Sequence, residues 1–246
     1  MANQRFGKHP PKIDYRTLRF RSYATSKLPA PPPAQNVLPR LYDKLNVNDP
    51  TMLFPMDGND AVGDCTIAGV AHAITTYRGA VGQKKIMTTK AVLKVYYHLT
   101  GGPDTGLVML DVLNYWRQKK IGGDEILAYV TIDPKNHDHI KQAIGLFNGV
   151  YLGFQVQEQC LQQFDQGQPW TPGKLTNDGH AVYAVGYDQQ GLILLTWGKT
   201  QRATWAWLDE CVDEAYAILP PEAKNLEFAP GFDLKQLQDD LAAVAD

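Results

Sequence analysis

The chain has 246 residues, of which 44% are hydrophobic and 20% charged, enough apolar material for a full core. This composition excludes a disordered protein, and no charge-free stretch reaches the ~20 apolar residues of a membrane helix. The first residues lack the apolar segment of a secretory signal, so we expect a cytoplasmic location and no membrane partner. Three cysteines without a CxxC pair argue against a disulfide scaffold or a zinc site, and we expect no metal and no cofactor.

Charge is distributed unevenly along the sequence. Residues 1–40 hold one acid, Asp14, and eight basic side chains, which gives this arm about +7 and the remaining residues about −9. The basic residues are Arg5, Lys8, Lys12, Arg16, Arg19, Arg21, Lys27 and Arg40. We expect the arm to bind the acidic body of its own chain or a neighbouring subunit, and nucleic acid is the less favoured partner. Prolines at 29 and 31–33 favour an extended course at its end.

The first strong helix signal follows Asp64, which can cap a helix that ends near Gly79. Apolar residues recur there at helical spacing: Ile67, Val70, Ala71, Ile74 and Tyr77. This pattern puts Cys65 in the first turn, where free N–H groups and the helix dipole favour a thiolate. Cys65 is therefore a candidate nucleophile, and the alternative is a small buried hydrophobic residue.

The remaining pattern changes from helices to strands along the chain. Helical spacing predicts helices over residues 89–100 and about 107–119, and a short helix closed by Asn148-Gly149. Alternation predicts a strand over 150–157 and two strands joined at residues 188–191, and an amphipathic stretch then runs into a short apolar strand that ends at 219. This segregation indicates an α+β domain with a helical half and a β half.

His180 follows Asn177-Asp178-Gly179, so we expect a loop to deliver it to the end of a strand. An imidazole at that place can face a helix N-terminus from the opposing half. Together, Cys65 and His180 are the minimal pair for a thiolate nucleophile activated by a base.

Four segments resemble papain-like cysteine peptidases. GNDAVGDC resembles the nucleophile loop, with Cys65 as nucleophile and Asn59 where the family has a Gln that donates to the oxyanion. GHAVYAVGYD resembles the base-bearing strand, with His180 as the catalytic base. LLTWG resembles the next strand and turn, with Trp197 and Gly198 in the places that shield the third catalytic residue. IKQAIGLFNGVYLGFQV resembles the element that enters the β half.

The resemblance covers about residues 50–219 and implies an α+β, papain-like fold. In this fold a helical half bearing the N-terminus of the Cys helix packs against an antiparallel β half bearing the His. We therefore divide the chain into a basic, Pro-rich N-terminal arm (1–47), a papain-like domain (48–219) and a C-terminal tail with an amphipathic helix (220–246). The domain comprises a helical half over about 48–140 and a β half over 141–219.

The sequence also departs from the family pattern. The position of the family's catalytic Asn falls on Leu195 without a gap and on Thr196 with one deletion, and only the Thr hydroxyl can orient an imidazole. Val62 replaces the usual half-cystine, which agrees with a reducing compartment. Only 64 residues precede Cys65, so we expect the restraint on an active peptidase to differ from a long propeptide, for example an arm that crosses the cleft.

The resemblance implies a cysteine hydrolase that cleaves a peptide or isopeptide bond in a peptide or protein substrate. Cys65 would attack the carbonyl, His180 would protonate the leaving group, Asn59 would stabilise the oxyanion and Thr196 would orient the imidazole. The alternative is a papain-like fold with weak or no catalysis that serves binding or assembly, for example as a component of a phage particle.

The tail and the arm are candidate contacts for a protein partner in that alternative. The tail carries Leu234, Leu237, Leu241 and Val244 on one helix face. Packing of this face on the same chain is favoured over packing on a partner.

Overall fold

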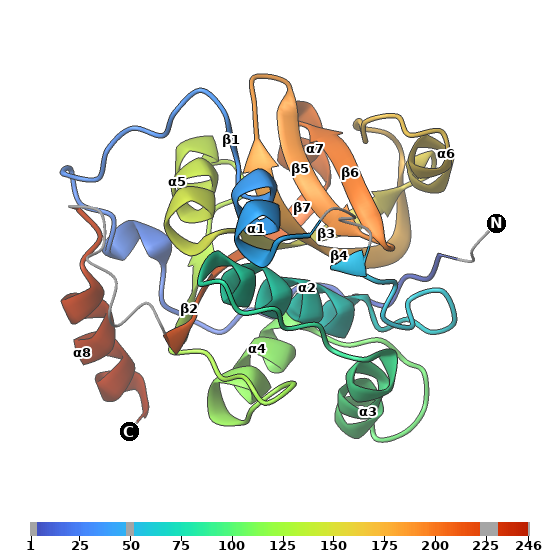
Figure 1. The fold of residues 1–246 in the computed structure, drawn as a ribbon, viewed down its shortest axis with the longest axis horizontal. Coiled ribbons are helices and arrows are strands. Elements are labelled where there is room, and N and C mark those ends of the chain that lie inside the picture. The colour runs from blue at the N-terminus through green and yellow to red at the C-terminus, as the bar shows by residue number, and fades with distance from the viewer. Residues whose placement is uncertain (1–3, 48–51, 222–230, 246) are drawn as a thin grey trace.

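The computed structural model describes residues 4–47, 52–221 and 231–245. A group of helices packs against one antiparallel sheet, and further helices flank that sheet (Figure 1), so the α+β fold expected from the sequence is confirmed. The predicted boundary between arm and body at residue 48 and part of the tail (222–230) lie outside the described residues. Among the residues described, no helix has the length and apolar character needed to span a membrane.

The helical half is built around α2 (Cys65–Ala80), with α3 (Thr89–Thr100) and α4 (Met109–Gln118) beside it. Nearly every side chain of α2 is buried, because the helix lies between the sheet and the other helices. The predicted helix over 89–100 has the observed bounds, since Thr88 accepts a bond from the Ala91 N–H and Gly101 adopts a left-handed conformation. Asp64 precedes α2 as expected, but its side chain makes no capping hydrogen bond, so that part of the prediction is wrong.

The β half is a seven-stranded antiparallel sheet in the order β2-β7-β3-β4-β5-β6, and β1 pairs with β4. The strands are β1 (Gln35–Asn36), β2 (Ala128–Ile132), β3 (Val150–Gln157), β4 (Leu175–Tyr187), β5 (Gly191–Thr196), β6 (Lys199–Thr204) and β7 (Val212–Leu219). His180 pairs with Phe154 inside β4 and not at its start, because residues 175–179 extend this strand. The expected position of His180 at a strand end is therefore wrong.

Four further helices precede the tail: α1 (Leu38–Leu45), which packs on α2, and α5 (His137–Phe147), α6 (Cys160–Asp165) and α7 (Trp205–Cys211) in the β half. Helix α5 is closed by Asn148 in the left-handed region, as the Asn-Gly pair predicts. No pattern in the sequence indicated α1, α6, β1, β2 or β6. These elements are short, so their residues hold too few periods for a recognisable pattern.

The arm and the tail pack on each other at one end of the molecule (Figure 1). The arm forms a short 3-10 helix, η1 (Phe20–Ser22), and its Phe20 and Tyr23 contact Phe232 of the tail. Helix α8 (Leu234–Ala245) follows, and the Tyr23 hydroxyl donates to Asp240 at 2.8 Å. The described tail therefore packs on its own chain.

Candidate active site

Cys65 is the first residue of α2 and is 1% exposed. The side chains of Cys65, Asn59, His180, Thr196 and Trp197 line one small cavity of about 10 Å³ between the two halves. The fold thus brings together all the candidate site residues, although they come from a loop, a helix and two strands.

His180 projects from β4 and Thr196 ends the neighbouring strand β5. The imidazole Nε2 lies 2.8 Å from the Thr196 hydroxyl, while Nδ1 has no hydrogen-bond partner and is buried. Successive side chains of a strand point to opposite faces, so Leu195 and Thr196 cannot both face the ring. The residue beside the imidazole is Thr196, which answers the alternative that the sequence left open.

Trp197 links the imidazole to Asn59. Its indole stacks on the His180 ring at 4.2 Å between centroids, and its Nε1 donates to Oδ1 of Asn59 at 2.7 Å. The Asn59 amide in turn donates to the Val62 carbonyl at 3.1 Å. Trp197 holds a φ of 45°, a left-handed conformation that is rare for a bulky residue and that is typical of functional sites.

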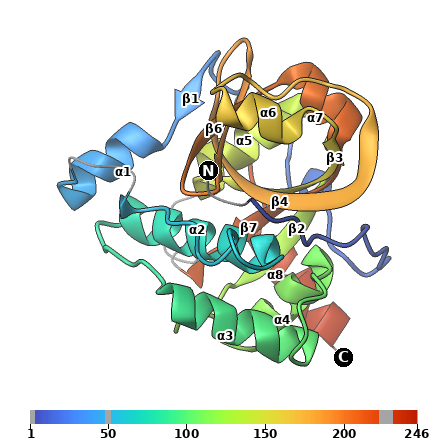
Figure 2. The same ribbon diagram turned by 90° about the vertical axis from the view of Figure 1, so that its right-hand side faces the viewer.

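The arm crosses the site between α2 and the sheet, where Figure 2 shows the dark-blue start of the chain. The amides of Gly7 and Lys8 donate to the Gly179 carbonyl at 3.2 and 3.0 Å, and the Leu107 amide donates to the Gly7 carbonyl at 2.8 Å. A Cβ atom on Gly7 would lie 1.8 Å from the Gly63 carbonyl oxygen, so the arm and the loop before Cys65 touch through their backbones.

The side chains of the arm also close the site. Phe6 lies edge-on to His180 at 5.7 Å and to Trp197 at 5.8 Å between ring centroids. Lys8 points into the protein with its ammonium group between Asp213 and Glu214. The basic arm therefore binds its own acidic body at the cleft, in agreement with one of the two partners expected from its charge.

Burial controls the ionisation of the pair in this closed form. It raises the pKa of Cys65 to about 12, although backbone amides of Ala181 and Gly7 act in the opposite direction. It lowers the pKa of His180 to about 3. The expected thiolate at the helix N-terminus is thus wrong for the closed form, because loss of water disfavours both charged partners more than the helix N-terminus favours the thiolate.

Two buried acids that the sequence did not indicate as site residues, Asp57 and Asp64, lie in the loop before Cys65. Asp57 and Asp64 are 2% and 0% exposed, and neither Asp57 Oδ1 nor the Asp64 carboxylate has a hydrogen-bond partner. Burial raises the pKa of Asp57 to about 7 and, with help from the nearby Asp57 charge, that of Asp64 to about 8. Nε2 of His72 on α2 lies 3.6 Å from Asp57. Two acids near a loop carry no burial signal in sequence, so only the fold reveals this group.

Within the described ranges, no group of three or more His, Cys, Asp or Glu side chains is placed to hold a metal ion. Cys160 and Cys211 are free and buried, away from the pair described above.

Comparison with solved structures of other proteins identifies the fold of this chain. The chain is similar to xylellain, a cysteine protease from Xylella fastidiosa, with a TM-score of 0.64 and 17% identity over 89% of this chain and 98% of that one. A procathepsin B from Trypanosoma congolense matches with a TM-score of 0.60 and 13% identity over 87% and 86% of the two chains. A digestive procathepsin L 3 from Tenebrio molitor matches with a TM-score of 0.56 and 12% identity over 89% of this chain and 76% of that one.

Sequence comparison gives no such match: no family model and no curated protein matches this chain. The identities to the solved structures are low, so the likeness rests on the path of the backbone. That path, with a central helix packed on an antiparallel sheet, establishes that the chain has the fold of the papain-like cysteine proteases.

Proposed function

We propose that the protein is a cysteine hydrolase that cleaves a peptide or isopeptide bond and that its own arm holds it closed. The observation that supports this function best is the shared cavity of Cys65 and His180, at the start of α2 and inside β4. The unpartnered Nδ1 of His180 is available for the thiol, because Nε2 is bonded to Thr196. This arrangement supplies a nucleophile, a base and a group that orients the base.

The reaction would proceed by acyl transfer. His180 takes the proton of Cys65, the thiolate attacks the carbonyl carbon, and the imidazolium then protonates the leaving amine. Water hydrolyses the thioester and restores the free thiol. The Cys65 backbone N–H and the second N–H of the Asn59 amide are the proposed oxyanion donors, because the first amide N–H is bonded to Val62.

Displacement of the arm is the proposed activation step. In the closed form both members of the pair are 1% exposed, so neither substrate nor water reaches them. Removal of Gly7 and Lys8 from the site would return water to the pair and lower the free energy of the thiolate-imidazolium state. The thiol pKa would then fall from its closed-form value.

The test is the rate at which iodoacetamide modifies Cys65 between pH 5 and 9, read by mass spectrometry on full-length chains. Gly7→Val opens the arm, because even a Cβ atom collides with the Gly63 backbone. We expect Cys65 to react at least about tenfold faster in this variant than in the wild type. The rate should also reach a plateau below the ordinary thiol pKa of ~8.5.

The controls separate the ion pair from simple exposure. His180→Ala in the opened chain should abolish the plateau, Thr196→Val should shift it to higher pH, and Thr196→Ser should preserve it. Cys160 and Cys211 are internal standards, since burial raises the pKa of both thiols. An opened chain whose Cys65 follows an ordinary thiol titration would contradict the hydrolase and favour a binding or assembly role.

A further inference from the structure

The cleft contains an acidic pocket that the reaction described above does not use. Lys8 of the arm fills it, and this side chain is 1% exposed. Its Nζ lies 2.9 Å from Asp213 and 3.1 Å from Oε1 of Glu214. Tyr216 donates to the other Glu214 oxygen at 2.8 Å and fixes the carboxylate in place.

The walls of the pocket match the stem of a long basic side chain. A Cβ atom on Gly153 would lie 2.2 Å from Cε of Lys8, 2.5 Å from Sδ of Met109 and 2.7 Å from Cγ of Glu214. Gly153 therefore leaves a slot whose sides are apolar and whose end holds two carboxylates. Such a slot suits Lys or Arg, whose methylene stems pack on apolar surface while their charged heads bind carboxylate.

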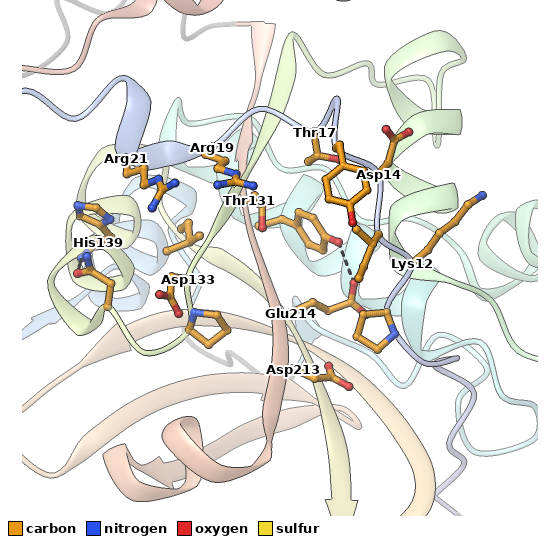
Figure 3. A pocket seen from close by; sticks show the side chains of 17 residues that line it. Lys12, Asp14, Thr17, Arg19, Arg21, Thr131, Asp133, His139, Asp213 and Glu214 are labelled. Atoms are coloured by element: carbon orange, nitrogen blue, oxygen red, sulfur yellow. Dashed lines mark hydrogen bonds between the residues drawn. The ribbon is translucent and has the colours of Figure 1, made fainter.

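The pocket favours a cation. Glu214 is 5% exposed, and burial raises its pKa while the Lys8 ammonium lowers it. Without Lys8, two adjacent carboxylates would remain with one of them almost fully desolvated. Figure 3 shows Asp213 and Glu214 at the edge of a cavity of about 450 Å³. Asp213 lines this cavity, and 31% of its side chain is exposed to solvent.

The position of the pocket relates it to a bound substrate. Gly7 contacts the backbone of the loop that leads to Cys65, and its amide lowers the pKa of the Cys65 thiol. Lys8 is the next residue. On the other side of Gly7, Phe6 contacts the ring of His180, the proposed proton donor to the leaving group. His180 would protonate the leaving group, so the leaving group of a scissile carbonyl in the place of Gly7 would lie on the Phe6 side. A substrate bound in this way would run in the opposite direction to the arm, with its acyl side toward the pocket.

We propose that this pocket, formed by Met109, Gly153, Asp213 and Glu214, selects Lys or Arg as the second residue before the scissile bond. The inference rests on the proposed hydrolase function and names its substrate class: peptides or proteins with a basic residue at that position. Lys8 occupies the pocket in place of the substrate side chain.

The test uses the full-length Gly7→Val/Lys8→Ala chain, in which the pocket is vacated. Dipeptidyl acyloxymethyl ketones carry Ala next to the electrophile and Lys, Arg, norleucine or Glu before it. Attack by the Cys65 thiolate forms a thioether and releases the carboxylate leaving group. We expect the Lys and Arg probes to label Cys65 at least about tenfold faster than norleucine and about a hundredfold faster than Glu.

Matched variants assign the preference to the two carboxylates. Asp213→Asn/Glu214→Gln should bring the Lys and norleucine probes to within about threefold of each other. Asp133→Asn is the control, because Asp133 lines the same cavity without contacting Lys8. Equal labelling rates for the Lys and norleucine probes in the opened chain would contradict the proposed selectivity of the pocket. If iodoacetamide still modified Cys65 rapidly in that chain, the proposed hydrolase function would remain supported.

A binding measurement tests the pocket without a reactive thiol. Fluorescence anisotropy follows a labelled peptide of residues 4–12 on the opened chain that also carries Cys65→Ala. Replacing the Lys of residue 8 in this peptide by norleucine should weaken binding at least about tenfold, and only when Asp213 and Glu214 are intact. This result would support the pocket even if no probe labels Cys65, and equal binding of both peptides would refute it.

Discussion

At the residue scale, ionisation at the site follows from water exclusion. Cys65 and His180 are both neutral in the closed form, because burial acts against a thiolate and an imidazolium alike. A tightly bound arm therefore blocks access and also removes the charge separation that the proposed reaction needs. The same exclusion of water raises the pKa of Asp57 and Asp64.

The two acids predict a stability that falls as pH rises. Their pKa values are about 7 and about 8 in the folded chain and exceed the ordinary value of 3.8. Between pH 3.8 and about 8 the native state therefore binds more protons than the unfolded state, and stability falls as pH rises. Asp57→Asn should reduce the loss of unfolding free energy between pH 6.5 and 8.5 by about 1 kcal/mol. Urea unfolding at several pH values measures this slope, and Asn suits the left-handed φ of 58° at this position.

The buried histidines act in the opposite direction. Burial lowers the pKa of His72 to about 4 and that of His180 to about 3, so their contribution to stability rises with pH and is nearly complete above about 7.5. The slope between about pH 7.5 and 8.5 therefore reports mainly the acids. Asp60→Asn is the matched control, because Asp60 is exposed. An equal slope in wild type and Asp57→Asn would show that Asp57 is ionised in the folded protein.

At the element scale, one glycine determines how closely α2 approaches the sheet. Tyr151 of β3 donates its hydroxyl to the Thr66 carbonyl at 2.7 Å, and a Cβ atom on Gly69 would lie 2.7 Å from the Tyr151 ring. This contact fixes the first turns of α2, and hence Cys65, against β3, which pairs with the strand β4 that carries His180.

Two glycine substitutions should therefore have opposite effects on stability. Gly69→Ala should lower the free energy of unfolding by about 1–3 kcal/mol, because the ring is held by its hydrogen bond and cannot retreat. Gly145→Ala in α5 should raise it by about 0.5–1 kcal/mol, because the added methyl meets only the flexible end of Gln35 at 3.1 Å. Chemical denaturation measures both. A gain at Gly69 would show that the helix and the sheet are less tightly packed.

At the scale of the whole molecule, the arm and the tail contact each other at one end of the domain. Phe20 and Tyr23 of the arm contact Phe232, and Leu237 of α8 is fully buried. The arm thus has two separate anchors, the Lys8 pocket in the cleft and the aromatic contact with the tail. The proposed displacement of its first residues from the cleft would therefore not require residues 20–23 to unpack.

Leu237→Ala should free α8 without opening the domain. Loss of a buried leucine costs about 2–5 kcal/mol, which exceeds what a short exposed helix can supply by itself. Hydrogen exchange read by mass spectrometry should become faster in α8 and remain slow in α2 and β4. Lys235→Ala is the control, because Lys235 is exposed and pairs only with Asp239 at the surface. Faster exchange throughout the chain would show that the tail stabilises the whole fold.

The sequence by itself determined the elements with long periodic patterns and the residue types of the site. The helix over 89–100 has its predicted bounds, because its periodic pattern follows the buried face. The strand over 150–157 also has its predicted bounds, although nearly all of its residues, and not every second one, are buried. The resemblance around Cys65 and His180 likewise rests on local residues, and it predicted the fold that the solved structures share.

The tertiary structure decided what depends on the distance between remote residues. Thr196 faces His180 and Leu195 does not, because the pairing of β5 with β4 sets which side chain points to the ring. The charge of the arm predicted an acidic partner, whereas its path through the cleft and the contact of Lys8 with Asp213 and Glu214 appear only in the fold. Burial is the common physical reason: it converts the expected thiolate into a neutral thiol, and no pattern of neighbouring residues reports how much water a side chain retains.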